Sequence, residues 1–343
     1  MNFVRTESPA EHHVPNEPAS RTAGRVVVVS LQRSGTHLLK EAMTALGYSL
    51  IGRLGRQPGK FVENPAFTRR IERKLLRAVY PEDELSNPVD SRDETLIERT
   101  TAQAGDALLE SWKIHLGLRE RPSAVTDDSL TALTTHALTS DAAHRFRDTP
   151  AGLCWFLPEL ALNRVDRVFL DEWIETGEPR IVFNYRDPRD MVLSMVNFLA
   201  THRRADLVEL PIHQAYAELL QKIPTTAERL AFALRDSSFP GIDGLERALW
   251  LRYHPKVCAL SFEDLVGSAG GGSEVAQLAG VTRLVEFLGT DINPSVVASR
   301  LFNPRSFTFH RGQTGSWRKE FTADHEKLFS ERYGNLAALY GYR

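Results

Sequence analysis

The chain has 343 residues, of which 42% are hydrophobic and 25% charged, close to ordinary globular usage. Lys and Arg number 42 and Asp and Glu 44, so the net charge of −2 offers no basic field for nucleic acid. The two cysteines are too few for a disulfide framework, and no apolar run reaches the ~18 residues of a membrane span. The first residues lack the apolar core of a secretory signal, so we expect a cytoplasmic protein.

The first 24 residues are rich in Pro, Glu, Ser and Asn and contain little that could be buried. This composition predicts a disordered N-terminal tail. Residues 25–343 are predicted to form a single domain with a large insertion around residues 52–178. Helical patches at residues 69–79 and 105–112 stand between polar segments in this insertion.

Apolar runs alternate with helical patterns through the rest of the chain. Strands are predicted at Val26–Val29, Arg180–Tyr185 and from residue 257 onward, because each run is apolar and rich in β-branched or aromatic residues. Helical spacing follows at residues 38–46, 169–177, 190–199 and 282–288, with a glycine stop after three of the four. This order predicts an α/β fold, a doubly wound parallel sheet with helices on both faces.

The segment Ser30–His37 joins the first predicted strand to the first predicted helix. In a parallel sheet such a strand–loop–helix junction offers free backbone N–H groups and a helix dipole to a phosphate. Gly35 allows close backbone approach, and Arg33 adds a permanent charge. Compared with the GxxxxGK[ST] nucleotide loop, Thr36 replaces the Lys and His37 the Ser/Thr that binds magnesium, which argues against an ordinary kinase or ATPase.

A second anion site is predicted where residues 186–194 follow the next buried strand. Arg186 stands at the strand exit, and Pro188 and Asp190 suit the first turn of a helix. Ser194 lies two turns into that helix. A guanidinium and a hydroxyl that converge on one point suit a phosphate monoester. The two loops together could hold the two ends of one bisphosphorylated nucleotide.

Four segments of the chain resemble motifs of the sulfotransferases that use 3′-phosphoadenosine 5′-phosphosulfate (PAPS). Leu31–Thr36 resembles the first-loop motif [YxP][KR]SGT, and Arg186–Ser194 matches R-[ND]-P-[KR]-D-x-x-x-S at every fixed position. Residues 311–317 and 321–322 resemble the R-K-G-x-x-G-x-W…F-T segment, with His310 in place of its first basic residue. Ser261–Leu265 resembles [FS]-Y-E-D-L. The four occur in family order.

The resemblance implies the donor PAPS, the product adenosine 3′,5′-bisphosphate (PAP) and no metal. It implies that the 5′-phosphosulfate is cradled by the loop residues Arg33, Ser34, Gly35, Thr36, His37 and Leu38. Arg33 takes the position of the family's catalytic cation at the bridging oxygen. Arg186 and Ser194 are implied to bind the 3′-phosphate, and Arg311 with the Gly312 backbone to close over it. Trp317 is expected near the nucleotide base.

The acceptor hydroxyl, or less often amine, needs a general base, which is a histidine in many members of the family. His144 is favoured because it lies nearest to Arg186 and begins a polar segment. The alternatives are His115, His136 and the carboxylates, including Glu110 and Asp141.

The acceptor itself is expected to be a small molecule, a glycolipid or a natural-product scaffold, with its pocket shaped by the insertion at 52–178. Two alternative hypotheses about the function stay open. One is a P-loop nucleoside or nucleotide kinase, which would need ATP and magnesium, and the other is a nucleotide-binding module without turnover.

Overall fold

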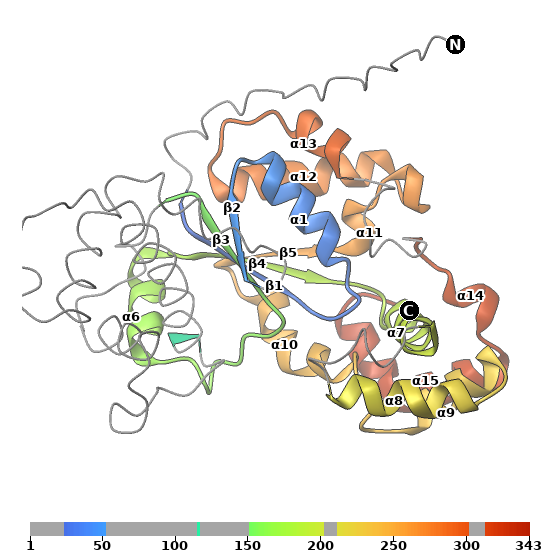
Figure 1. Ribbon diagram of the computed structural model, residues 1–343. Helices are drawn as coiled ribbons and strands as arrows, with labels where there is room; N and C mark the ends of the chain where they lie inside the picture. The colour runs from blue at the N-terminus through green and yellow to red at the C-terminus, as the bar shows by residue number, and fades with distance from the viewer. Residues whose placement is uncertain (1–23, 53–114, 117–150, 202–210, 302–312) are drawn as a thin grey trace, which may run out of the picture.

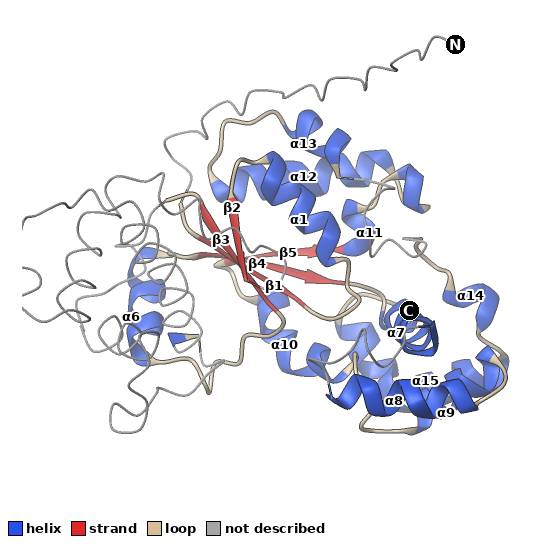
Figure 2. Cartoon of the chain, in the orientation of Figure 1, coloured by secondary structure: helices blue, strands red, loops and turns tan. Residues whose placement is uncertain are grey.

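A computed structural model describes residues 24–52, 115–116, 151–201, 211–301 and 313–343. Five strands form one parallel sheet in the order β2-β3-β1-β4-β5. They are β1 (Val26–Ser30), β2 (Ser49–Gly52), β3 (Leu153–Leu157), β4 (Arg180–Tyr185) and β5 (Val257–Ser261). Helices cover both faces (Figures 1 and 2), so the predicted α/β fold is confirmed.

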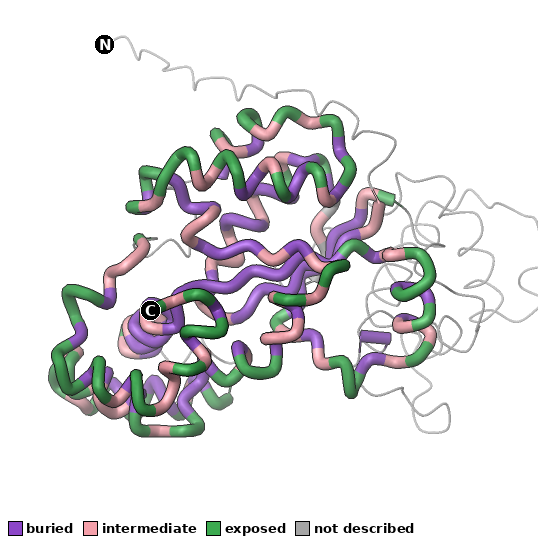
Figure 3. Tube along the Cα trace, turned by 180° about the vertical axis from the view of Figure 1, so that it is seen from behind, coloured by how far each residue is buried: buried purple, intermediate pink, exposed green. Residues whose placement is uncertain are grey.

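The central strand β1 explains the layers. All five of its residues are buried, because β3 and β4 flank it and helices lie above and below. Val26 and Val28 face a core shared with α1 (Thr36–Ala45), α12 (Glu274–Leu288) and α13 (Pro294–Arg300). Val27 and Val29 face the opposite core, as the period of two along a strand requires. Figure 3 shows the buried strands running through the middle of the molecule.

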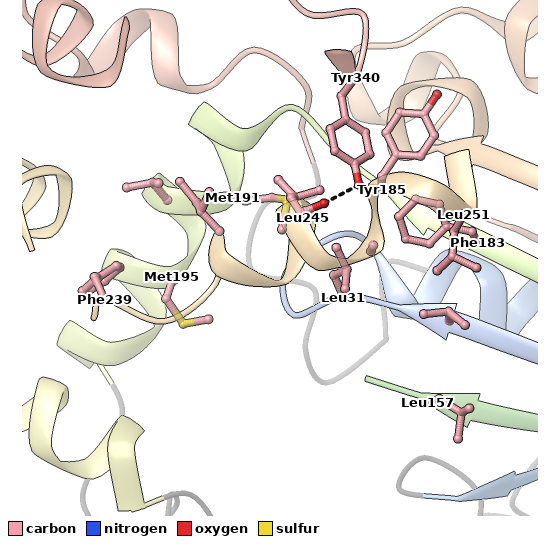
Figure 4. Packing of buried hydrophobic residues seen from close by; sticks show 14 of the residues in the cluster. Leu31, Leu157, Phe183, Tyr185, Met191, Met195, Phe239, Leu245, Leu251 and Tyr340 are labelled. Atoms are coloured by element: carbon pink, nitrogen blue, oxygen red, sulfur yellow. Dashed lines mark hydrogen bonds between the residues drawn. The ribbon is translucent and has the colours of Figure 1, made fainter. Parts of the chain in front are cut away.

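The second core is the larger one and contains most of the remaining helices. It is built with α6 (Arg167–Thr176), α7 (Pro188–Thr201), α8 (Pro211–Lys222), α9 (Thr226–Arg235), α10 (Asp243–Tyr253), α14 (Trp317–Glu320) and α15 (Ala323–Leu339). Figure 4 shows Tyr340, just after α15, with its ring toward Tyr185 and its hydroxyl on the Leu245 carbonyl of α10, at 2.7 Å. Tyr340 is therefore packed against strand β4.

The predicted glycine end of one helix is confirmed, and the end of one strand has an equally clear physical cause. Helix α6 ends at Gly177, whose φ of 71° is the left-handed conformation that favours glycine. Strand β5 ends at Ser261, because a capping box between Ser261 and Asp264 starts the short helix α11 (Phe262–Leu265). The glycine-rich stretch after it forms a 3₁₀ turn, Ser268–Gly270, before α12 begins.

Sequence patterning predicts neither β2 nor β3. Strand β3 lies within the stretch expected to be an insertion, yet it pairs with β1 on one side and β2 on the other. Its five residues are uniformly buried, and a short apolar run without alternation does not distinguish a strand from a buried helix. The rest of the stretch between residues 52 and 151 lies outside the described residues, apart from His115 and Leu116.

The register of the sheet positions the candidate site. Ser30 pairs with Asn184 across β1 and β4, and Tyr185 pairs with Ser261 across β4 and β5. The three strands therefore end side by side, and the segments that follow them meet at one edge of the sheet. In open parallel sheets this carboxyl edge is where ligands bind.

Candidate functional site

The loop after β1 turns sharply before it enters α1. The Ser34 N–H donates to the Leu31 carbonyl at 3.2 Å. Arg33 has a φ of 64°, and it is the only non-glycine residue with a positive φ in the described parts of the chain. Gly35, at φ 99°, caps α1. Backbone strain of this kind persists only where surrounding contacts enforce it, and it is often found at functional sites.

Gly35 is also required by packing. A Cβ atom added there would lie 2.4 Å from the Phe262 ring, far inside contact distance. Phe262 in turn lies under the Arg186 guanidinium, 4.2 Å from its carbon to the ring centroid. The segment after β5, Ser261–Leu265, thus supports the loops after both β1 and β4.

A cluster of hydroxyl groups and one amide holds the first loop to β4. The Oδ1 atom of Asn184 accepts from Ser34 Oγ at 2.8 Å and from Ser30 Oγ at 3.1 Å. Thr36 Oγ1 lies 2.8 Å from Ser30 Oγ. The Asn184 Nδ2 atom is buried without a hydrogen-bond partner. Asn184 is missed by the motifs, although a polar residue inside the apolar run of β4 is a signal that could have found it.

The two predicted anion loops touch each other. Arg33 Nε donates to Ser194 Oγ at 2.9 Å, across 161 residues of sequence. The Arg33 guanidinium also stacks on Phe198, 4.8 Å from the ring centroid, one turn further along α7. Arg33 and Ser194, which the resemblance assigns to opposite ends of the nucleotide, are in direct contact in this structure.

Arg186 lies beside Arg33 and is largely buried. Its guanidinium donates to the Gln313 carbonyl at 2.8 Å and to the Arg33 carbonyl at 3.5 Å, while its Nε atom is buried without a partner. Burial and the charge of Arg186 lower the pKa of Arg33 to about 10, although a guanidinium at that value is still charged at neutral pH. The Asp190 carboxylate lies near this pair, with its Oδ2 atom 3.7 Å from Arg186 Nη2. Two cations with one carboxylate beside them still favour a further anion.

The remaining polar residues of the second loop hold the loop itself and the segment before α14. Arg189 forms a two-point pair with Asp187, both contacts being 2.9 Å, and its guanidinium stacks on Trp317 at 4.0 Å. Trp317 is thus packed into the larger core. Asp190 accepts from the N–H groups of Gly315, at 2.7 Å, and Trp317, at 3.0 Å.

The predicted site residues fall into three groups by position. The side chains of Arg33, Ser34, Thr36, Arg186 and Ser194 gather at the carboxyl edge of the sheet. Leu38 is buried in the smaller core, and its N–H donates to the Gly35 carbonyl at 2.9 Å. His144, His136, Glu110, Asp141, His310, Arg311 and Gly312 lie outside the described residues.

His115 is the one described histidine among the candidates for general base. It is buried next to the start of α6, and its Nδ1 atom lies 2.5 Å from the Asp166 carboxylate. Asp166 also caps α6 by accepting from the Phe169 N–H at 3.0 Å. These contacts tie His115 to a helix terminus, and the identity of the base stays a prediction.

A second histidine, which no motif predicts, contacts the first loop from helix α8. His213 of α8 is buried, and its Nε2 atom lies 2.8 Å from Gln32 Oε1. Gln32 directly precedes the strained Arg33, so α8 also holds the loop. Only the fold brings these two residues together, because 181 residues separate them.

No cluster of three or more His, Cys, Asp or Glu side chains suited to a metal ion occurs within the described ranges. Among the helices described, none has the length and apolar character to cross a membrane.

Comparison with known proteins gives likenesses among solved structures alone. No family model and no curated protein matches the chain. Among solved structures, the chain is similar to the mouse sulfotransferase SULT7A1 complexed with PAP. The identity is 15%, the alignment covers 95% of this chain and 91% of the mouse chain, and the TM-score is 0.45.

Proposed function

We propose that the protein is a sulfotransferase that moves a sulfuryl group from PAPS to a hydroxyl group, less often an amine, of a small-molecule, glycolipid or natural-product acceptor. The observation that carries the proposal is the contact between the two loops, Arg33 Nε to Ser194 Oγ at 2.9 Å. Together with Arg186, these residues supply two cations and a hydroxyl at one edge of the sheet. The four motifs of the sequence supply the chemical identity of the ligand.

The residues present fit an anionic nucleotide. The buried Arg186 Nε and Asn184 Nδ2 atoms both lack partners, and a buried donor without an acceptor costs free energy. The mutual repulsion of Arg33 and Arg186 is relieved by negative charge between them. Phosphate groups satisfy both requirements, since they bring charge and several acceptor oxygens.

Each residue has a distinct proposed role. Arg186 and Ser194 hold the 3′-phosphate, and Ser34, Gly35, Thr36 and His37 form the turn around the 5′-phosphosulfate. Leu38, which the motif includes, is buried in the smaller core with its N–H on the Gly35 carbonyl, and it supports the turn. The acceptor oxygen bonds to sulfur while the bond between sulfur and the bridging oxygen breaks. Arg33 neutralises the negative charge that develops on the bridging oxygen in this step. Arg311 and Gly312 close over the nucleotide, and His144 takes the acceptor proton. The donor supplies the transferable sulfuryl group, and no metal is needed.

The first test separates a 3′-phosphate site from a general anion site. Arg186→Ala should weaken PAP binding by about 2–3 kcal/mol, the scale of a charge-assisted contact, because the 3′-phosphate loses its cation. Adenosine 5′-phosphate, which lacks that group, should be affected far less. Calorimetry with both ligands, with EDTA present, measures the difference. Equal losses would remove the 3′-phosphate assignment, and PAP binding that requires magnesium would favour the kinase reading.

Turnover is tested by an acceptor screen with isotopically labelled PAPS, read as a mass shift of the acceptor. A product that carries the label is expected, and its structure would identify the acceptor class. Tight PAP binding with no transfer to any acceptor would favour the binding-module reading.

A further inference from the structure

Glu263 links the end of the chain to the start of the second loop. Its Oε1 atom accepts from the Asp187 N–H at 3.2 Å, and its Oε2 atom accepts from the Tyr342 hydroxyl at 2.6 Å. The Asp187 amide belongs to the peptide unit that also carries the Arg186 carbonyl. The Glu263 carboxylate therefore fixes the peptide plane from which the Arg186 side chain departs.

Glu263 is also a competitor for Arg186. Burial raises the pKa of Glu263, while the Tyr342 hydroxyl, the Asp187 N–H and the charge of Arg186 lower it. The guanidinium is thus close enough to act on the carboxylate. An ion pair between Glu263 and Arg186 would occupy the cation that the second loop offers to a phosphate.

Tyr342 is itself held in place from several sides. Its N–H donates to the Ala337 carbonyl at 2.9 Å, and its ring packs edge-on against Tyr185 with the centroids 6.3 Å apart. The neighbouring Arg343 carbonyl accepts from Arg189 Nη1 at 3.0 Å. Arg343 therefore contacts the second loop directly, and Tyr342 is linked to it through Glu263.

We propose that Tyr342 is a positioning residue of the nucleotide site. Its hydroxyl holds the Glu263 carboxylate on the Asp187 amide and away from Arg186, which leaves that guanidinium for the 3′-phosphate. This role rests on the proposed function, because it concerns the same phosphate subsite.

The test is Tyr342→Phe, which removes the hydroxyl and keeps the ring. Without that donor, the carboxylate is free to turn toward Arg186 and compete with the ligand. PAP affinity should fall about tenfold, the scale of one hydrogen bond to a charged group. Affinity for adenosine 5′-phosphate should stay within about twofold, since that ligand does not use Arg186. Calorimetry with both nucleotides measures the two effects.

Two further variants separate positioning from a structural role. Tyr340→Phe removes another tyrosine hydrogen bond at the same end of the chain, the one to Leu245 in Figure 4. It should lower the melting temperature and leave the preference for PAP unchanged. The double variant Tyr342→Phe/Glu263→Gln should regain PAP affinity, because a neutral amide cannot form an ion pair with Arg186.

The outcomes distinguish this role from the proposed function. If the wild-type protein binds PAP no better than adenosine 5′-phosphate, the 3′-phosphate assignment fails and the role of Tyr342 falls with it. If the wild type prefers PAP and Tyr342→Phe keeps that preference, only the role of Tyr342 is overturned. Equal losses for both nucleotides, or a double variant without recovery, would make Tyr342 a structural residue.

Discussion

His37 lies in the first turn of α1, near the two cations Arg33 and Lys40. Burial and the charges of Lys40 and Arg33 lower the pKa of the His37 imidazole from its ordinary value, which favours the neutral form. A phosphate bound at this turn acts in the opposite direction and raises the pKa. Ligand binding then takes up a proton, and PAP affinity gains a contribution that grows as the pH falls from 7 toward the pKa of the free protein.

The matched variant is His37→Gln, which keeps a polar side chain and removes the titration. Between pH 7 and pH 6, the ratio of wild-type to variant affinity for PAP should rise by about two- to threefold, within the tenfold per pH unit that one proton allows. The phosphates of the ligand titrate near pH 6, but their effect cancels in the ratio. A ratio independent of pH would mean that His37 does not face the nucleotide phosphates.

Single residues show what one sequence can and cannot predict about the site. Arg33, Arg186 and Ser194 are predictable, because each stands at a fixed offset within a motif that follows an apolar strand. Asn184 is marked as a polar residue inside an apolar run, but its contacts are not predictable, nor are those of Tyr342, because their partners lie 150 and 79 residues away. Such contacts depend on strand register and on the packing of the chain end. The spacing of residues along the sequence gives no information about either.

At the scale of elements, the turn between β1 and α1 depends on one glycine. Gly35→Ala combines a left-handed backbone with a Cβ atom 2.4 Å from Phe262, whose own position is fixed by the core. Gly289→Ala is the matched control, because Gly289 also has a positive φ, 65°, but nothing lies within 4 Å of its added Cβ. The control thus measures the backbone strain alone.

We expect Gly289→Ala to lower the free energy of unfolding by about 1–2 kcal/mol. Gly35→Ala should lose about 1–3 kcal/mol more, because Phe262 must move. The moved ring no longer supports Arg186, so PAP binding should be lost as well. Urea unfolding and calorimetry measure the two effects. Equal unfolding losses for the two variants would show that the contact between Gly35 and Phe262 is loose.

The elements themselves are only partly predictable. Strands β1, β4 and β5 follow from their apolar runs and from the loops after them, and these are the strands that carry the site. Strand β3 has an equally apolar sequence, but no chemical motif follows it to mark a strand end. Strand β2 is only four residues long, Ser49–Gly52, and contains a serine and a glycine. Its place at the sheet edge comes from pairing with β3, which lies about 100 residues further along the chain.

At the scale of the whole molecule, the candidate site lowers the stability of the ligand-free folded protein. The net charge of the chain is −2, yet Arg33 and Arg186 stand side by side in a partly buried place. The Asp190 carboxylate, 3.7 Å from Arg186 Nη2, offsets this repulsion only in part. The repulsion that is left disfavours the folded protein until a further anion binds, as expected where function and stability compete. Arg189, by contrast, is a cation of the same loop with its charge paired, since both partners of the Arg189–Asp187 pair are largely buried.

Substitution by methionine is expected to have opposite effects on stability at Arg33 and at Arg189. Arg33→Met keeps the contact with Phe198 and removes the repulsion, so the melting temperature of the ligand-free protein should rise by about 1–3 °C. The extra stabilisation from saturating PAP should shrink, because ligand affinity falls. Arg189→Met leaves Asp187 as a buried charge without its partner and should lower the melting temperature by several degrees. Thermal unfolding of the three proteins, with and without PAP, measures all of these shifts. If Arg33→Met is destabilised as much as Arg189→Met, the hydrogen bond to Ser194 outweighs the repulsion, and the two cations are not held in strain for a ligand.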